Sequence, residues 1–108
     1  MWAHIFEHLC MSSLYILYSP SLDKYYTGIT TDPVKQRLEK HNSGFYGKRF
    51  TSAASDWVIQ LEIETIDYVH ARRMELYVKS RKSRVYILSL IQSKTEQDQL
   101  FNRTISIG

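Results

Sequence analysis

Five side chains in this 108-residue chain are of types that could take part in phosphodiester chemistry. They are Tyr15, Tyr26, Arg37, His41 and Glu75. A guanidinium can grip phosphate oxygens in two places, and an imidazole can donate to a phosphate or take up a proton. A single carboxylate can hold Mg²⁺ when waters and phosphate oxygens complete its shell. The elements that carry these residues decide whether they can act together.

The two tyrosines can lie on one face of a hairpin. The runs Leu14–Tyr18 and Lys24–Ile29 have the composition of strands, and the intervening "SPSLD" contains proline and aspartate, which form turns. If the loop comprises Ser19–Leu22, Tyr15 stands directly opposite Tyr26, and opposed residues of antiparallel strands point to the same face. By itself such a pair is equally typical of ordinary aromatic packing.

A helix is predicted to present Arg37 and His41 together. Asp32 is a typical N-cap and Pro33 a typical first helical residue, while Gly44 stands where a helix stop is expected after "VKQRLEKHN". Residues four positions apart on a helix share one face, so the guanidinium and the imidazole can act on the same group. A solvated helix face is the alternative interpretation.

A third strand is indicated by alternation over Trp57–Ile66. Ile59, Leu61 and Ile63 alternate with polar residues in this segment. That pattern predicts one buried and one wet face.

Two helices are predicted after this strand, from Tyr68 to about Ser80 and over the apolar run "YILSLIQ". The predicted fold is therefore α/β, a small and mainly antiparallel three-stranded sheet flanked by helices in ββα-β-αα order. We expect residues 1–12 to form an N-terminal extension, 13–93 the domain and 94–108 a loose C-terminal tail.

Basic residues surround Glu75 and recur in a glycine-rich loop. Arg72 and Lys79 stand at positions i−3 and i+4 from Glu75, which is the spacing of an ordinary ion-pair ladder. The alternative is a metal-binding carboxylate within a phosphate-binding surface. Bases interleaved with aromatics suit nucleic acid. The candidate nucleic-acid contacts are Lys48, Arg49, Arg72, Lys79, Arg81, Lys82 and Arg84.

Composition narrows the class of protein. Fourteen Lys and Arg against eleven Asp and Glu leave a small positive balance, which is compatible with an anionic partner. A single cysteine excludes an internal disulfide and a zinc site built on paired cysteines. The first ten residues resemble neither a signal peptide nor a membrane span. We therefore expect a cytoplasmic protein with no membrane partner.

Taken together, these residues resemble the GIY-YIG nuclease domain. The two tripeptides that name the family correspond to "SLY", Ser13–Tyr15, and "YTG", Tyr26–Gly28. "RLEKHNSG" resembles the family's first helix, and "ARRMELYVKSRKSR" resembles the segment that presents its metal-binding glutamate. The resemblance spans Ser13–Ile91. It is closest in size to the small stand-alone bacterial members, which are related to the nuclease domain of the excision-repair incision subunit.

The resemblance implies an endonuclease that hydrolyses phosphodiester bonds in DNA, with RNA not excluded, in repair or recombination. It implies one Mg²⁺ or Mn²⁺ held by Glu75, and a catalytic set of Tyr15, Tyr26, Arg37, His41 and Glu75. A tyrosine would help to deprotonate the attacking water if Arg37 and the metal lower its pKa. Gly28, beside Tyr26, is expected to leave room for the backbone of a nucleic acid.

The chain departs from the family pattern at three places. Its arginine follows the second tyrosine by one residue more than is common, Ile29 replaces a lysine of the repair subunits, and Ile87 stands where some members have asparagine. These departures leave open a binding module of the same fold that holds nucleic acid without cutting it. A protein–protein adaptor is a third alternative.

Overall fold

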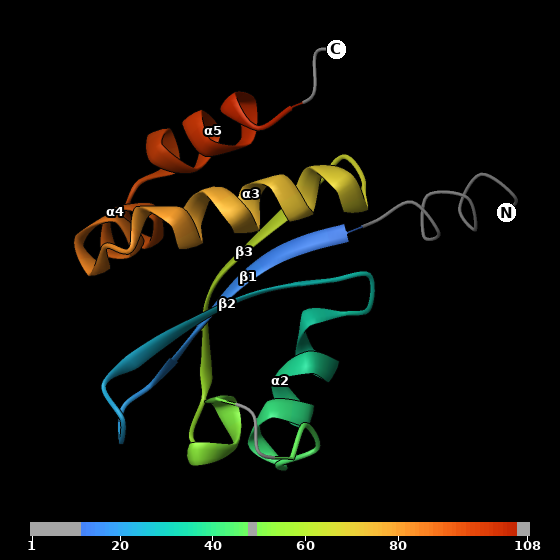
Figure 1. Cartoon of the computed structure of the whole chain (residues 1–108), viewed down its shortest axis with the longest axis vertical. Helices are drawn as coiled ribbons and strands as arrows, with labels where there is room; N and C mark the ends of the chain where they lie inside the picture. The colour runs from blue at the N-terminus through green and yellow to red at the C-terminus, as the bar shows by residue number, and fades with distance from the viewer. Residues whose placement is uncertain (1–11, 48–49, 106–108) are drawn as a thin grey trace, which may run out of the picture.

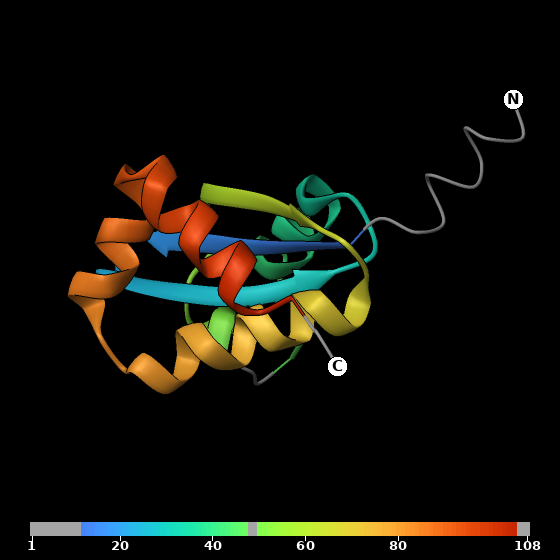
Figure 2. The ribbon, with the colours of Figure 1, turned by 90° about the horizontal axis from the view of Figure 1, so that it is seen from above.

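The protein forms one three-stranded sheet between two layers of helix (Figure 1). The computed structural model describes residues 12–47 and 50–105. Its elements, in chain order, are β1 (Ser12–Ser19), β2 (Lys24–Thr30), α2 (Val34–Asn42), η1 (Phe50–Ala53), β3 (Val58–Thr65), α3 (Tyr68–Arg81), α4 (Arg84–Gln92) and α5 (Lys94–Arg103). The strand order is β2-β1-β3 and both pairings are antiparallel (Figure 2). The predicted fold class is confirmed.

The hairpin loop has the predicted length but begins one residue later. It comprises Pro20–Asp23, because Asp23 adopts a left-handed conformation and its backbone N–H donates to the Ser19 carbonyl at 2.7 Å. Tyr15 therefore stands opposite Gly28, and the predicted direct pairing with Tyr26 is wrong. Moving the loop by one residue changes the pairing by two, which preserves the face to which each side chain points. The two phenols remain diagonal neighbours, with ring centroids 6.3 Å apart.

The sheet separates two apolar clusters. Leu14 and Ile16 of β1 point toward the layer formed by α3, α4 and α5, where they pack with residues such as Met74. Tyr15 and Leu17 point to the opposite face, toward α2 and the segment around η1. β1 is buried on both faces because it is the central strand, and its alternation divides the molecule into a helical support and a candidate site.

The alternation predicted for β3 holds over only part of the strand. Leu61 and Ile63 pack against the cluster under α3. The register jumps between Ile16 and Leu17, which pair with Leu61 and Ile59, so one residue of β3 is left over as a bulge. Because a bulge adds one residue to the strand, the side chains on its two sides follow opposite alternations relative to the faces of the sheet. Ile59 therefore turns away from Leu61 and Ile63 and is 36% exposed, contrary to the prediction.

The prediction of a loose tail after residue 93 is wrong for residues 94–103. Ser93 caps α5 by accepting from the Glu96 N–H, and Leu100 is buried in the same cluster as Leu14. The Gln97 side chain donates to the Leu90 carbonyl. A short helix with few apolar residues has no clear period, yet one deeply buried leucine anchors it.

Except for Ser12 in β1, the predicted N-terminal extension lies outside the described residues. Among the described helices, none has the length and apolar character needed to cross a bilayer.

Candidate active site

Tyr15 extends from the central strand across β2, and Gly28 makes this possible. A Cβ atom added to Gly28 would lie 2.6 Å from both Cζ and Oη of Tyr15, and 2.9 Å from Cε2 of Tyr26. The backbone φ of Gly28 is not in the positive range that favours glycine. Glycine is therefore required here for space and not for backbone conformation. The room beside Gly28 is filled by the phenol of Tyr15, which corrects the expectation that it accommodates a nucleic-acid backbone.

The phenol of Tyr15 meets the imidazole of His41 on α2. Tyr15 Oη lies 2.9 Å from His41 Nε2, and His41 Nδ1 lies 2.7 Å from Thr51 Oγ1. Burial, followed by the nearby charge of Arg37, lowers the pKa of His41 to about 4. The ring is therefore neutral at pH 7, and a neutral imidazole donates at one nitrogen and accepts at the other. It links two hydroxyls in one hydrogen-bonded chain.

The pKa of Tyr15 is raised, not lowered. Burial is the main cause, and the neighbouring phenols of Tyr26 and Tyr46 add to it. Arg37 acts in the opposite direction, as expected, but its charge is outweighed because the phenol is only 2% exposed. Glu75 also raises the pKa of Tyr15, so its carboxylate acts electrostatically on this site. The phenol keeps its proton at neutral pH.

The guanidinium of Arg37 is held by three partners. Its Nε donates to Thr30 Oγ1 at 3.0 Å, its Nη1 donates to Tyr46 Oη at 2.8 Å, and its Nη2 lies 3.3 Å from the carboxylate of Asp32. The hydrogen bond to Tyr46 raises the pKa of Arg37. The prediction that Asp32 is the N-cap of α2 is wrong. The N-cap is the next residue, Pro33, and it makes no side-chain capping bond. Asp32 orients the arginine instead.

Four of the five predicted catalytic residues line one cavity of about 320 Å³. Tyr26 packs on His41 with ring centroids 4.8 Å apart, and its ring is near-parallel to that of Phe50. The lining residues are Tyr15, Tyr26, Ile29, Arg37, His41, Tyr46, Phe50 and Thr51. Hydroxyl, imidazole and guanidinium groups thus converge on a space with an aromatic wall.

Glu75 belongs to α3, which runs beside β2 (Figure 2). It is 7% exposed, and its two carboxylate oxygens accept from Arg72 Nη1 at 2.6 Å and from Lys79 Nζ at 3.0 Å. The predicted ion-pair ladder is therefore present. Within residues 12–47 and 50–105, no group of three His, Cys, Asp or Glu side chains gathers. A cation on this oxygen ligand would need water and phosphate oxygens to complete its shell, which is a normal arrangement for Mg²⁺.

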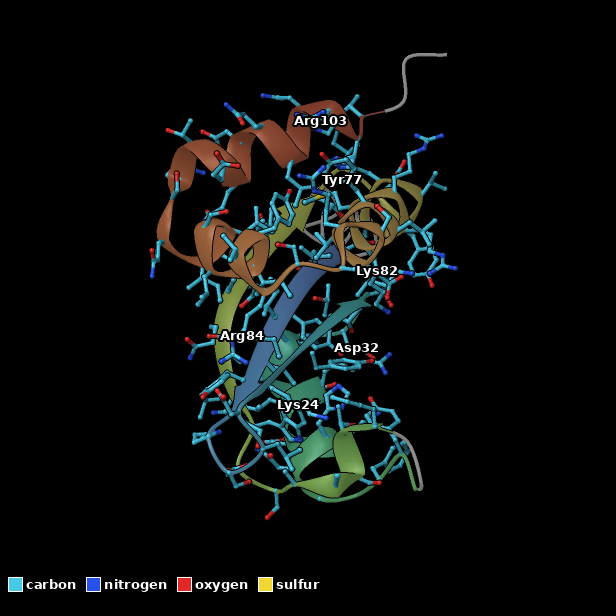
Figure 3. The ribbon with its side chains drawn as sticks, turned by 60° about the vertical axis from the view of Figure 1, so that its left-hand side comes forward. Lys24, Asp32, Tyr77, Lys82, Arg84 and Arg103 are labelled. Carbon is cyan, nitrogen blue, oxygen red and sulfur yellow. The ribbon has the colours of Figure 1, made fainter. Side chains whose placement is uncertain are left out.

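The predicted nucleic-acid contacts lie in different places. Arg81 lies over the rings of Tyr77 and Tyr86, and Arg103 of α5 contacts the same Tyr77 ring. Arg84 pairs with Asp23 of the hairpin at 2.5 Å. Lys79 and Lys82 line a groove beside β2, and Figure 3 shows Lys82 at the end of α3. Arg72 remains with Glu75. The predictions for Lys48 and Arg49 lie outside the described residues.

Three polar residues of the site were not predicted from the sequence: Thr30, Tyr46 and Thr51. Thr51 reaches His41 because the indole of Trp57 donates to the Thr51 carbonyl at 2.8 Å and thereby fixes η1. No spacing in the sequence reveals a contact made by a loop. Tyr46 offered the nearest signal, as an aromatic residue in a basic loop.

A family model described as the GIY-YIG catalytic domain matches residues 11–99 of the chain. The match includes all the residues of the cavity, Glu75 and the first turns of α5. Comparison with curated proteins and with solved structures found no match.

Proposed function

The chain belongs to the GIY-YIG catalytic domain family, whose members are of nuclease type, and we propose that it is an endonuclease hydrolysing phosphodiester bonds of DNA with one Mg²⁺ or Mn²⁺. The observation that carries the proposal is the hydrogen bond between Tyr15 and His41, placed beside Arg37 in one cavity. The Tyr15–His41 pair, which could accept a proton, and Arg37, which could anchor a phosphate, thus line the same cavity. We further propose a role in repair or recombination, through cutting selected by DNA shape.

The Tyr15–His41 pair offers a route for the proton of the attacking water. The water gives a proton to Tyr15 Oη while the phenolic proton passes to His41 Nε2, and Nδ1–H donates to Thr51. No free phenolate has to accumulate, which suits a phenol whose pKa is raised. The low pKa of His41 is due partly to Arg37. A bound phosphate would offset that positive charge and help the ring to accept the proton.

Arg37 would hold the scissile phosphate. A guanidinium has five N–H donors, and its charge is best used on oxygens where negative charge builds up. Its contacts with Thr30, Tyr46 and Asp32 fix the direction of the fork before substrate arrives. Preset donors cost little reorganisation in the transition state.

Glu75 would hold the metal, which when bound supplies Lewis-acid stabilisation of the scissile phosphate and the leaving 3′ oxygen. Arg72 and Lys79 now occupy its oxygens, but the side chains of both bases are about half exposed, at 53% and 50%. These exposed bases would move onto substrate phosphates as the cation takes their place, because the buried carboxylate needs a positive partner in either state. The expected products carry a 3′-hydroxyl and a 5′-phosphate.

Cleavage of supercoiled, branched and single-stranded DNA in Mg²⁺ or Mn²⁺ tests the proposal. We expect Glu75→Gln to reduce the rate by at least about a hundredfold, because charge stabilisation is lost. Glu39→Gln, an exposed carboxylate on α2, is the matched control and should cut normally. If the wild-type protein cuts no nucleic acid, or Glu75→Gln cuts as fast as wild type, the enzyme proposal fails.

One observation favours a second candidate, a nucleic-acid-binding module without catalysis. Both oxygens of Glu75 are already engaged by bases, as in a purely structural ion-pair ladder. This candidate predicts salt-dependent DNA binding that survives Glu75→Gln and Tyr26→Phe, with no cleavage under any metal condition.

A further inference from the structure

A second cavity adjoins the candidate active site. It measures about 440 Å³ and lies between β2 and the junction of α3 with α4. We call it the β2 groove and define it by Lys24, Tyr26, Phe50, Lys79, Lys82 and Ile87. Tyr26 and Phe50 line both the groove and the active-site cavity, so the two spaces share a wall. Its volume is within the range of small-ligand sites.

The groove combines an open aromatic surface with cations. Phe50 is 48% exposed although it is a large apolar residue, and its ring is near-parallel to that of Tyr26. Lys24 Nζ lies 5.7 Å from the centre of the Phe50 ring. Lys79 and Lys82, in the last turn and at the end of α3, line the same groove. Aromatic faces beside a basic track are what proteins use to hold single-stranded nucleic acid.

Lys82 occupies a backbone position that favours glycine. It ends α3 with φ 48° and ψ 44°, in the left-handed region. Helices commonly place glycine there, because a side chain in this conformation is strained. The chain keeps a lysine at this strained position, where it lines the groove; Figure 3 shows it where α3 ends. Strain retained at one position is an indication of function when other observations agree.

We propose that the β2 groove binds one unpaired nucleotide next to the scissile phosphodiester, with its base stacked on Phe50 and its flanking phosphates on Lys24 and Lys82. The inference rests on the proposed nuclease function and names its substrate class, DNA with a single-stranded segment. A base inside a duplex already has both faces stacked on its neighbours. It cannot offer a face to Phe50 unless it is unstacked, which costs free energy. The groove therefore selects nucleic acid whose base is already free.

Binding, measured without catalysis, tests the inference. Fluorescence anisotropy of the wild-type protein in EDTA compares a labelled single-stranded oligonucleotide with the same sequence in a blunt duplex. We expect tighter binding of the single strand. Phe50→Ala should weaken single-strand binding by about five- to a hundredfold and leave duplex binding nearly unchanged. Tyr68→Ala, an exposed aromatic at the other end of α3, is the matched control and should bind both as wild type does.

Lys82→Gly provides a second variant that should not harm the fold. Glycine suits the left-handed position, so the variant should unfold at an equal or higher urea concentration. We expect weaker single-strand binding and a log–log salt slope smaller by about 0.7, for one lost phosphate contact. Lys35→Ala, at an exposed position of α2, is its control.

The outcomes are separable from those of the cleavage test. A protein that prefers single strands through Phe50 and Lys82 but never cuts would retain the groove inference and refute the nuclease proposal. The inference is overturned if the duplex binds as tightly as the single strand, or if Phe50→Ala weakens both equally. It is also overturned if Lys82→Gly binds unchanged, or if neither nucleic acid binds.

Discussion

Gly28→Ala is the sharpest test of how the site is built. The new Cβ would stand 2.6 Å from Tyr15 Cζ and Oη, well inside ordinary contact distance. The phenol would have to leave its place against His41. We expect overpacking to cost about 1–3 kcal/mol, and loss of the Tyr15–His41 hydrogen bond to cost about 1 kcal/mol. Alanine regains about 0.5–1 kcal/mol of the strand cost of glycine. The expected net destabilisation is about 1–3 kcal/mol.

The assay is a double-mutant cycle by urea unfolding. In a Tyr15→Ala background only the edge of the Tyr26 ring, with Cε2 2.9 Å away, still crowds the new Cβ, so Gly28→Ala should cost much less than in the wild-type protein. The expected coupling energy is about 1–3 kcal/mol. Gly44→Ala is the control. Gly44 has φ +75°, and a Cβ added there would meet no atom within 4 Å. The cost of this substitution is therefore conformational and should be equal in both backgrounds. Equal costs of Gly28→Ala in both backgrounds would refute the reasoning.

Three further predictions follow from the same contacts. His41→Gln should remove a pH dependence: the folded ring titrates near pH 4 instead of 6.5, so its contribution is complete above pH 6.5 and is lost as the pH falls toward 4. Between pH 7 and 4 the wild-type protein should lose about 3 kcal/mol more than the variant in urea titrations, at 1.36 kcal/mol per pKa unit; parallel curves would contradict this. Tyr15→Phe should lower the cleavage rate by about a hundredfold or more with unfolding cooperativity retained, and an unchanged rate would exclude the proton route. Leu100→Ala should destabilise the whole domain by about 2–5 kcal/mol because Leu100 is 1% exposed, whereas a loose tail would give no change in the urea midpoint.

Several features of the fold could be predicted because they depend on neighbours in the chain. α2 spans Val34–Asn42, the segment whose proline and glycine mark its ends. The buried line Ala71, Met74 and Val78 on α3 follows from helical spacing. The ion pairs of Glu75 follow from the same spacing. Four of the five candidate catalytic residues, which residue type and family resemblance together predict, line the same cavity.

Other features depend on contacts between distant segments, and only the tertiary structure decided them. The bulge that turns Ile59 outward arises from pairing with β1, and the burial of Leu100 arises from packing in one cluster with residues of β1, α3 and α4. The pKa of Tyr15 rises because the folded layers remove water from the phenol, an effect that outweighs the charge of Arg37. Residue types and short spacings thus determined which groups are available. Tertiary packing determined which of them meet, because burial and long-range contact do not exist until the chain has folded.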